Sequence, residues 1–420
     1  METVNNFSSL NLQKDIFVKM SVISAFLTSS LTASGYKIPE QSLSGLALGA
    51  ANIAAVNGAD ASYYNPANMA FLDGGKSEVE AFITYVNLPK MSYTDNRGTF
   101  YDGESKAENI VAPLFHFVTP TYKEDWRFGF SVVVPGGLAK RWDTPYQAST
   151  AKKFSLRIIE ANPTAAYKIN DWASFGFGAR AVYSMGEVAS DANGVGQPVK
   201  MDMEGDSFDF GYNLALTVKP VEALSLAATY RSKVNLTLEG DADLHLLTYP
   251  QYDGSASVEV PLPAVLDLAI AYTFLKKTTV EFVYERVYWS SYKGIDFNFP
   301  HESSDPTTAF FGSLKVKNWK DSDTFRLGVT HLASENLKLM AGFTIDKTPA
   351  PKNTLAFELP DSNSKNYSAG FEYKLNQDMS IGMAYLFSNK EDRGAVNSNI
   401  NGTFSDGSAH LVNMSFKYRF

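Results

Sequence analysis

Residues 208–218 carry the pattern that decides the fold. Their sequence is Phe-Asp-Phe-Gly-Tyr-Asn-Leu-Ala-Leu-Thr-Val. Large apolar side chains occupy every even position of this stretch, and small or polar side chains occupy the odd positions. A period of two residues puts all the large apolar side chains on one face of a β-strand. The same alternation returns in Trp126–Val134, Phe175–Tyr183 and Met379–Phe387. The sequence therefore predicts strands with one apolar and one polar face.

Fourteen segments of this kind follow one another beyond residue 76. They lie near residues 78–89, 110–121, 125–137, 154–168, 172–186, 206–219, 223–239, 260–275, 278–292, 321–333, 336–347, 364–375, 378–389 and 408–420. Within segment 223–239 the apolar set, which we expect on the outer face, is Leu224, Leu226, Ala228, Tyr230, Val234, Leu236 and Leu238.

The connections between these segments strictly alternate between six short turns and seven long polar loops. In an up-and-down antiparallel sheet, every second connection lies at the same end, as in outer-membrane barrels. We therefore predict an all-β membrane protein, a 14-stranded antiparallel transmembrane β-barrel over residues 77–420. The alternative is a soluble β-sandwich, whose apolar faces would be buried between two sheets.

The composition agrees with a barrel and excludes several other classes. The chain has 420 residues, 20% of them charged, and no Cys. No stretch approaches the roughly 18 to 20 consecutive apolar residues that a spanning helix needs. The absence of Cys excludes disulfides, thiolate metal sites and Cys nucleophiles. The net charge of -8 is spread along the chain, so nucleic acid is not an expected partner.

The first 33 residues are predicted to be a signal peptide. Lys14 and Lys19 precede an apolar run over residues 21–31, and small residues follow at 32–35. A positive region, a short apolar region and a small-residue cleavage site direct a chain to export. Cleavage is expected after Ala33 or Ser34. The alternative is a disordered tail before a short buried helix.

Residues 34–76 do not alternate and are rich in small residues. A barrel of more than about eight strands encloses more space than its own side chains fill. We expect this segment, called the hatch below, to form short helices that plug the barrel. A periplasmic linker is the alternative, although Leu46, Tyr63, Tyr64 and Met69 are apolar for a solvated linker.

The chain ends inside its last predicted strand, on Phe420. This end resembles the terminal Phe signature of outer-membrane proteins that the barrel-assembly machinery handles. The machinery is therefore an expected partner during biogenesis.

Several short motifs carry a resemblance to a known family. They are Gly35-Tyr36, Glu40-Gln41-Ser42, Ser44-Gly45-Leu46, Asp60-Ala61-Ser62, Asn65-Pro66-Ala67, Ala166-Tyr167-Lys168-Ile169-Asn170, Tyr230-Arg231-Ser232, Leu262-Pro263-Ala264, Trp289-Ser290, Asn318-Trp319-Lys320-Asp321, Leu359-Pro360-Asp361 and Tyr418-Arg419-Phe420. With these motifs the chain resembles the FadL/TodX family, outer-membrane transporters of long-chain fatty acids and other hydrophobic compounds. The resemblance spans essentially the whole mature chain.

The resemblance implies a barrel closed by an N-terminal hatch. It also implies capture of a hydrophobic ligand at extracellular loops, an internal binding pocket, and sideways release at a kink in the third strand. The hatch motif would be Asn65, Pro66 and Ala67. The kink would lie at Pro135, Gly136 and Gly137, where Pro lacks a ladder donor and Gly permits a bulge. An ordinary strand end at these residues is the alternative.

A ligand carboxylate inside such a barrel would need a cation. The candidates on predicted inward-facing positions are Arg180, Arg231, Lys233 and Arg326. The alternative for each is a wall residue paired with an inward carboxylate such as Glu239 or Asp267.

Two other function classes remain open from the sequence. An outer-membrane hydrolase would need a catalytic arrangement, but the five His are scattered and no Gly-x-Ser-x-Gly elbow occurs. We therefore expect no enzyme activity, no catalytic or metal site and no cofactor. A general porin or adhesin is the second alternative.

The expected location is the outer membrane of a Gram-negative bacterium, and the expected state is a monomer. The expected partners are hydrophobic small molecules, either fatty acids or aromatic hydrocarbons, and outer-membrane lipid with lipopolysaccharide.

Overall fold

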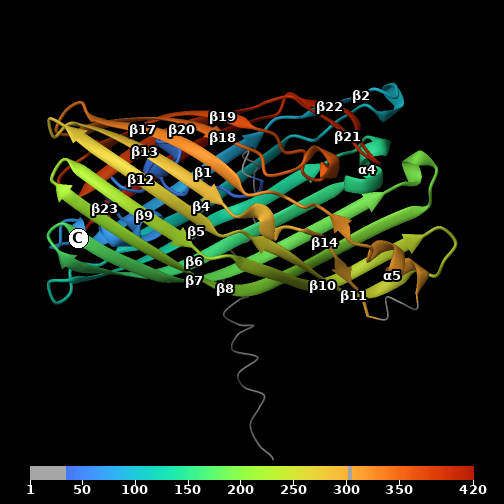
Figure 1. The fold of residues 1–420 in the computed structure, drawn as a ribbon, viewed down its shortest axis with the longest axis horizontal. Helices are drawn as coiled ribbons and strands as arrows, with labels where there is room; N and C mark the ends of the chain where they lie inside the picture. The colour runs from blue at the N-terminus through green and yellow to red at the C-terminus, as the bar shows by residue number, and fades with distance from the viewer. Residues whose placement is uncertain (1–34, 301–304) are drawn as a thin grey trace, which may run out of the picture.

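The computed structural model describes residues 35–300 and 305–420, so the expected signal peptide lies outside the described residues. The described chain forms a closed 14-stranded antiparallel β-barrel (Figure 1). Its strands are β1 (Glu78–Leu88), β4 (Glu108–Val118), β5 (Trp126–Arg141), β6 (Lys153–Asn170), β7 (Ala173–Asp191), β8 (Val199–Val221), β9 (Leu224–Arg231) continued by β10 (Val234–Leu246), β11 (Tyr252–Leu262) continued by β12 (Val265–Phe274), β13 (Thr278–Val287), β17 (Ser322–Leu332), β18 (Leu337–Asp346), β19 (Ser364–Lys374), β20 (Met379–Lys390) and β23 (Ser408–Arg419). Pairing of β1 with both β23 and β4 closes the ring.

The alternation along each strand separates the two faces of the wall, as the sequence predicts. On β8, Phe208, Phe210 and Tyr212 are exposed, whereas Ser207 and Asn213 are buried in the interior. An outward apolar face suits a wall that contacts hydrocarbon, because the closed ladder leaves no unpaired strand edge. Among residues 35–300 and 305–420, every helix is too short or too polar to span a bilayer.

The long connections gather at one end of the barrel and the short turns at the other (Figure 1). We call these the loop end and the turn end. The loop-end elements are β2 (Ser92–Asp95), η3 (Thr99–Tyr101), β3 (Gly103–Glu104), α4 (Pro145–Ala151), η4 (Asn193–Val195), η5 (Trp289–Ser291), β14 (Gly294–Ile295), β15 (Phe297–Asn298), α5 (Pro306–Phe311), β16 (Lys315–Val316), η7 (Lys352–Thr354), β21 (Arg393–Val396) and β22 (Asn401–Ser405).

The predicted facing of the seventh strand is wrong beyond Arg231. Residues 207–212 of β8 lie opposite residues 232–238 of the strand formed by β9 and β10. The β9–β10 strand therefore has one residue more than β8 between the same two ladder pairs. An extra residue is a β-bulge, and a slip of one residue moves every later side chain to the other face. Val234, Leu236 and Leu238 are consequently buried inside, whereas Lys233 and Glu239 are exposed.

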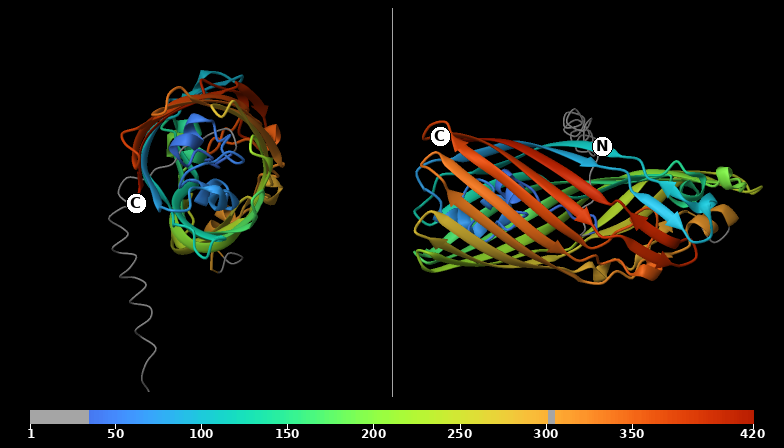
Figure 2. Two further views of the ribbon diagram at one scale, coloured as in Figure 1. Left: turned by 90° about the vertical axis from the view of Figure 1, so that its left-hand side faces the viewer. Right: turned by 90° about the horizontal axis from the view of Figure 1, so that it is seen from above.

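The hatch lies inside the ring of strands, as the view down the barrel shows (Figure 2, dark blue). It contains α2 (Leu43–Ala47), α3 (Ala61–Tyr64) and η2 (Pro66–Phe71). The Ser42 hydroxyl begins α2 by accepting the N–H of Gly45, as an N-cap does. Almost all of the hatch is buried against the wall.

Wall side chains hydrogen-bond directly to the backbone of the hatch. The Glu281 carboxylate accepts the N–H groups of Ile53, Ala54 and Ala55 at 2.6 to 3.1 Å. Thr344 and Ser368 donate to hatch carbonyl oxygens at 2.9 Å. Backbone groups that lack a helical or strand partner are thus satisfied by the barrel.

Candidate functional site

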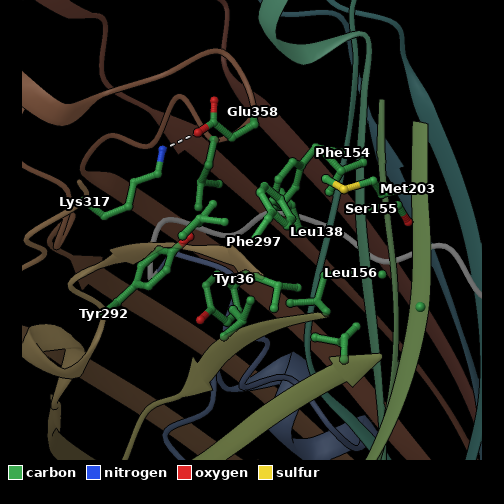
Figure 3. A pocket seen from close by; sticks show the side chains of 18 of the residues that line it. Tyr36, Leu138, Phe154, Ser155, Leu156, Met203, Tyr292, Phe297, Lys317 and Glu358 are labelled. Carbon is green, nitrogen blue, oxygen red and sulfur yellow. Dashed lines mark hydrogen bonds and ion pairs between the residues drawn. The ribbon is translucent and has the colours of Figure 1, made fainter. Parts of the chain in front are cut away.

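An apolar cavity lies between the hatch and the loop end (Figure 3). Its described lining is Tyr36, Leu138, Phe154, Ser155, Leu156, Gly186, Val188, Met203, Glu204, Gly205, Leu238, Gly240, Asp241, Ala256, Ser257, Val258, Val260, Tyr292, Ile295, Phe297, Lys317, Trp319, Ala350, Thr354, Leu355, Ala356, Glu358 and Leu359. We call it the inner cavity. Concave, mostly apolar sites with a few placed polar groups are typical of small-molecule binding.

One end of the inner cavity carries a buried ion pair between Lys317 and Glu358 (Figure 3). Burial alone would raise the pKa of Glu358, but the charge and hydrogen bond of Lys317 outweigh it and hold that pKa below its usual range. Glu204 and Asp241 also border the cavity, yet both residues are exposed and belong to the opposite face of the sheet. Lys317 is thus the one cation among the described lining residues.

Tyr36 of the hatch forms part of the cavity wall. Its ring meets Trp289 edge to face, with the centroids 4.7 Å apart, and also contacts Tyr292 and Trp319. Its hydroxyl donates to the carbonyl oxygen of Pro261. A residue near the start of the hatch is therefore held by the same surface that would hold a ligand.

A second cavity lies among the loops, is open to solvent, and is called the outer cavity. Residues of α4, η4, α5 and the segment 353–358 line it, and the Phe310 side chain on its border is half exposed. The two cavities share Phe154, Val188, Ile295, Phe297, Lys317, Thr354, Leu355, Ala356 and Glu358. The shared residues make the outer cavity continuous with the inner one at the Lys317 end.

The barrel wall is interrupted between β4 and β5. Ladder pairs join these strands only from Phe115 with Val132 to Val118 with Gly129. Toward the loop end, β5 also shifts its register against β6 between Val133 and Gly136. The backbone of β5 beyond Val132 consequently lacks ladder partners on β4, and we call this interruption the wall break.

Hatch residues 36–41, called the strap, take the place of β4 at the wall break. Ile38 donates its N–H to the Pro135 carbonyl (2.9 Å), and Gly137 donates to the Tyr36 carbonyl (2.7 Å). The Gln41 amide exchanges two hydrogen bonds with the backbone of Val134. The predicted kink residues are thus the ones that face the strap.

Gly136 lies where the strap approaches most closely. It pairs with Lys37 in an isolated antiparallel bridge. A Cβ atom at Gly136 would lie 2.9 Å from the Tyr36 carbonyl oxygen. A glycine is therefore needed for the strap to lie against the wall here.

The predicted hatch motif lies near the turn end and has a packing role. The Asn65 amide donates to the Ile53 carbonyl and to the Thr217 hydroxyl, both at 2.8 Å. Pro66 begins η2, and Ala67 packs on Gly176 of β7, where a Cβ would lie 2.4 Å from the Ala67 nitrogen. The motif thus joins two parts of the hatch to β7 and β8.

The structure brings Arg180 and Arg231 together but away from both cavities. Both guanidinium groups pair with Glu160, and that of Arg231 lies 4.4 Å from the centroid of the Tyr63 ring. These interactions bind the hatch to the wall. Within the described chain, neither arginine belongs to the lining of the inner or outer cavity.

The other two predicted cations are also separate from the cavities that the structure describes. Arg326 pairs with Glu285 at 3.0 Å and donates to the Gly49 carbonyl at 2.9 Å. Lys233 is exposed on the outer face, because the bulge reverses its orientation. A ligand contact for any of the four stays a prediction that the cavity geometry does not favour.

The sequence patterns did not identify Lys317, Glu358 or the glycines that line the inner cavity, which are Gly186, Gly205 and Gly240. Lys317 lies in a loop where no two-residue period assigns a direction, although it directly precedes the motif Asn318–Asp321. The motif Leu359-Pro360-Asp361 likewise follows Glu358 directly. The signal available was therefore proximity in sequence to family-like motifs within loops.

His116 and Ser131 form the type of pair that a hydrolase would use. Their Nδ1 and Oγ atoms are 2.9 Å apart, but the other ring nitrogen is 2.7 Å from the Gln41 carbonyl oxygen. Both side chains are fully buried beneath the hatch. The pair is a structural contact between wall and hatch.

Comparisons with known proteins agree with this geometry. A family described as outer membrane protein transport protein (OMPP1/FadL/TodX) matches residues 24–420. A long-chain fatty acid transport protein of Salmonella typhi is 24% identical over 446 residues, covering 97% of this chain and 100% of the relative. Outer membrane protein P1 of Haemophilus influenzae is 24% identical over 322 residues, covering 68% of each chain.

Two solved structures share the fold. The crystal structure of a Pseudomonas aeruginosa FadL homologue aligns with a TM-score of 0.78 at 21% identity, covering 92% of this chain and 99% of the other. The Pseudomonas putida toluene transporter TodX aligns with a TM-score of 0.70 at 17% identity, with the same coverage.

Proposed function

We propose that this chain, which belongs to the OMPP1/FadL/TodX family of outer-membrane transport proteins, takes up hydrophobic monocarboxylic acids such as long-chain fatty acids. The family consists of transport proteins of the outer membrane and not of enzymes. The observation that carries the choice of an acid is the Lys317–Glu358 pair at one end of an otherwise apolar cavity.

Capture would begin in the outer cavity. Phe310 of α5 offers half-exposed apolar surface there, close to the water that surrounds the loops. Each methylene group that leaves water contributes roughly 0.8 kcal/mol, so a long acyl chain favours the cavity without any specific polar contact. The shared lining residues then lead the ligand toward the inner cavity.

Binding in the inner cavity would use Lys317 for the carboxylate. Glu358 already neutralises this lysine, so an incoming carboxylate competes with Glu358 for the same ammonium group. The apolar chain would lie against the wall formed by β6, β7 and β8, opposite the ion pair in Figure 3. A neutral hydrocarbon would use the same apolar surface but would gain nothing from Lys317.

Release would occur sideways through the wall break. The strap fills that break, and its residue Tyr36 also contacts the cavity. A ligand that displaces Tyr36 would therefore weaken the hydrogen bonds from the strap to Pro135 and Gly137. Movement of the strap would open a path from the inner cavity to the membrane between β4 and β5.

Three finer expectations about partners join this proposal. The outward apolar face would contact outer-membrane lipid, with lipopolysaccharide around the loop end. Phe420, whose backbone exchanges two hydrogen bonds with Ser77, would present its aromatic ring to the barrel-assembly machinery. The closed barrel would act as a monomer.

Substitutions of the ion pair test the choice of an acid. Lys317→Gln should weaken oleate binding by roughly ten- to a hundredfold, the cost of a charge-assisted hydrogen bond, and Glu358→Gln should strengthen it. Binding of toluene should change by less than about twofold in both variants. Titration calorimetry on the purified protein gives these affinities, with Lys352→Gln as the control for an exposed lysine.

The opposite pattern would overturn the acid assignment. If toluene binds the wild-type protein and oleate affinity is the same in all variants, the cavity takes neutral hydrocarbons. If a planar bilayer instead records a large open conductance from the wild-type protein, the chain acts as a general porin.

A further inference from the structure

We propose that a row of three inward-facing glycines, Gly186, Gly205 and Gly240, sets the length of the apolar chain that the inner cavity accepts. The proposal rests on the proposed function, because it assigns a selective role within the same cavity. All three residues line that cavity, each from a different strand.

Strand register places the three glycines side by side. Gly186 of β7 pairs with Gly205 of β8, and Gly205 pairs in turn with Gly240 of β10. Leu156 of β6 and Ala256 of β11 continue the row on either side. Three adjacent strands thus present bare backbone to the cavity at the same height of the wall.

Larger side chains border the glycine row at the neighbouring inward positions. Val188 and Met203 lie on the loop-end side of the row, and Leu238 lies on its turn-end side. Because these residues also line the cavity, glycines between them would leave a recess in the wall, which Leu238 Cδ2 borders most closely at Gly186. Residues of this wall, such as Met203 and Leu156, lie across the cavity from Lys317 and Glu358 (Figure 3). A carboxylate at Lys317 would therefore direct the far end of its chain toward the recess.

The three glycines differ in what a side chain would meet. A Cβ at Gly205 would lie 2.8 Å from the Glu239 carbonyl oxygen, and a Cβ at Gly240 would lie 2.0 Å from that of Glu204. These two glycines are required by the close approach of β8 and β10. At Gly186 the nearest atom is Cδ2 of Leu238 at 2.8 Å, and the next is 3.9 Å away. A side chain at 186 is therefore opposed mainly by one flexible leucine and would occupy the recess.

Filling the recess should shorten the ligand that fits. A valine at 186 would exclude about two methylene groups of a long chain, each worth roughly 0.8 kcal/mol of burial, which is about tenfold in affinity. A chain too short to reach the recess would lose nothing. The glycine row thus predicts a change in chain-length preference and not a uniform loss.

The experiment compares saturated monocarboxylic acids from octanoate to stearate. Their affinities for wild type, Gly186→Ala and Gly186→Val are measured by titration calorimetry on the detergent-purified barrel. We expect Gly186→Val to weaken stearate binding about tenfold while octanoate changes less than about twofold, with Gly186→Ala between. Leu238→Ala in the Gly186→Val background should restore stearate binding, because it removes the atom that a side chain at 186 meets.

Two controls make the outcome decisive. Gly394→Val adds the same side chain in β21, where a Cβ would have only ordinary contacts, the nearest at 3.5 Å. Gly394 lines neither the inner nor the outer cavity. Leu238→Phe fills the recess from the side opposite Gly186. If Gly186→Val fails to fold, Leu238→Phe therefore takes its place in the binding measurements. It should reproduce the same loss for stearate alone.

The results separate this proposal from the proposed function. If the wild-type protein binds stearate and the loss in Gly186→Val is equal for octanoate and stearate, or absent for both, the glycine row does not select length. If wild type binds no member of the series, the proposed function fails, and the glycine proposal fails with it.

Discussion

Gly137 in the barrel wall donates its backbone N–H to the carbonyl oxygen of Tyr36 in the hatch, at 2.7 Å. This hydrogen bond replaces one that a neighbouring strand would otherwise make. Because the ring of Tyr36 lines the inner cavity, one residue of the strap contacts both the cavity and the wall break. The strap therefore offers a direct physical connection between ligand binding and the state of the wall.

The hydroxyl of Tyr36 provides the first test of this connection. Tyr36→Phe keeps the ring but leaves the buried Pro261 carbonyl without this donor, which costs about 1 kcal/mol of strap docking. Hydrogen exchange at the Ile38 amide, which bonds to Pro135, should accelerate by about fivefold. Exchange in β19 serves as the internal control. An unchanged rate at Ile38 would mean that Tyr36 does not hold the strap.

Arg231 and Lys233 should respond differently to the same substitution. Arg231→Gln leaves Glu160 with Arg180 alone and removes the contact with the Tyr63 ring, so the hatch should loosen by about 3 kcal/mol. Lys233→Gln alters an exposed side chain, with an expected effect within about 0.5 kcal/mol. Limited proteolysis of the hatch measures both variants, and equal protection of the two would contradict the placement of Arg231.

Glu40 should make hatch stability depend on pH. Both of its carboxylate oxygens are buried without a hydrogen-bond partner among the described residues. Burial raises the pKa of Glu40 from 4.5 to about 7. The positive charges of Arg326 and Lys37 oppose this rise, and the negative charge of Asp346 adds to it. The folded hatch therefore binds more protons than the unfolded hatch between these two values.

The stability that this protonation provides is complete below pH 4.5 and is lost as the pH rises to about 7. The loss amounts to about 3 kcal/mol, and Glu40→Gln should abolish it. Denaturant-dependent exchange of hatch amides at pH 5 and pH 8, corrected for intrinsic rates, measures the difference. A variant with the same pH dependence as wild type would exclude Glu40 as its source.

The sequence was sufficient for the fold because the alternation and the loop lengths are local signals. Phe208–Val218 and the alternating connections predict the strand number and the arrangement of the ends without any tertiary information. The bulge after Arg231 was not predictable, since polar residues alternate with apolar ones on both sides of it. A single inserted residue reversed Lys233 and placed Leu238 in the cavity.

The site was less accessible to sequence reasoning because it depends on distant contacts. Pro135, Gly136 and Gly137 mark an irregular strand, but their partners in the strap are about a hundred residues away along the chain. Arg180, Arg231 and Arg326 were identified as interior cations, and their carboxylate partners become visible only in the folded barrel. Lys317 and Glu358 meet from two separate loops, whose directions no periodicity fixes.

A reversible cross-link over the wall break tests the central claim of lateral release. Ala112 of β4 and Val134 of β5 are buried in one small cluster with Ile38 of the strap. The chain has no Cys, so Ala112→Cys with Val134→Cys introduces the only thiol pair, which a thiol-reactive cross-linker with a reducible spacer can join across the strap. Phe117→Cys with Phe130→Cys, at a regular ladder position of the same two strands, is the matched control.

Uptake of labelled oleate into cells that carry each pair, after cross-linking and again after reduction, is the most direct measurement. We expect the cross-linked 112–134 pair to reduce uptake at least about tenfold, with oleate binding to the purified protein unchanged and with full recovery after reduction. The control pair should transport in both states. Undiminished uptake through a barrel whose break is covalently closed would contradict release between β4 and β5.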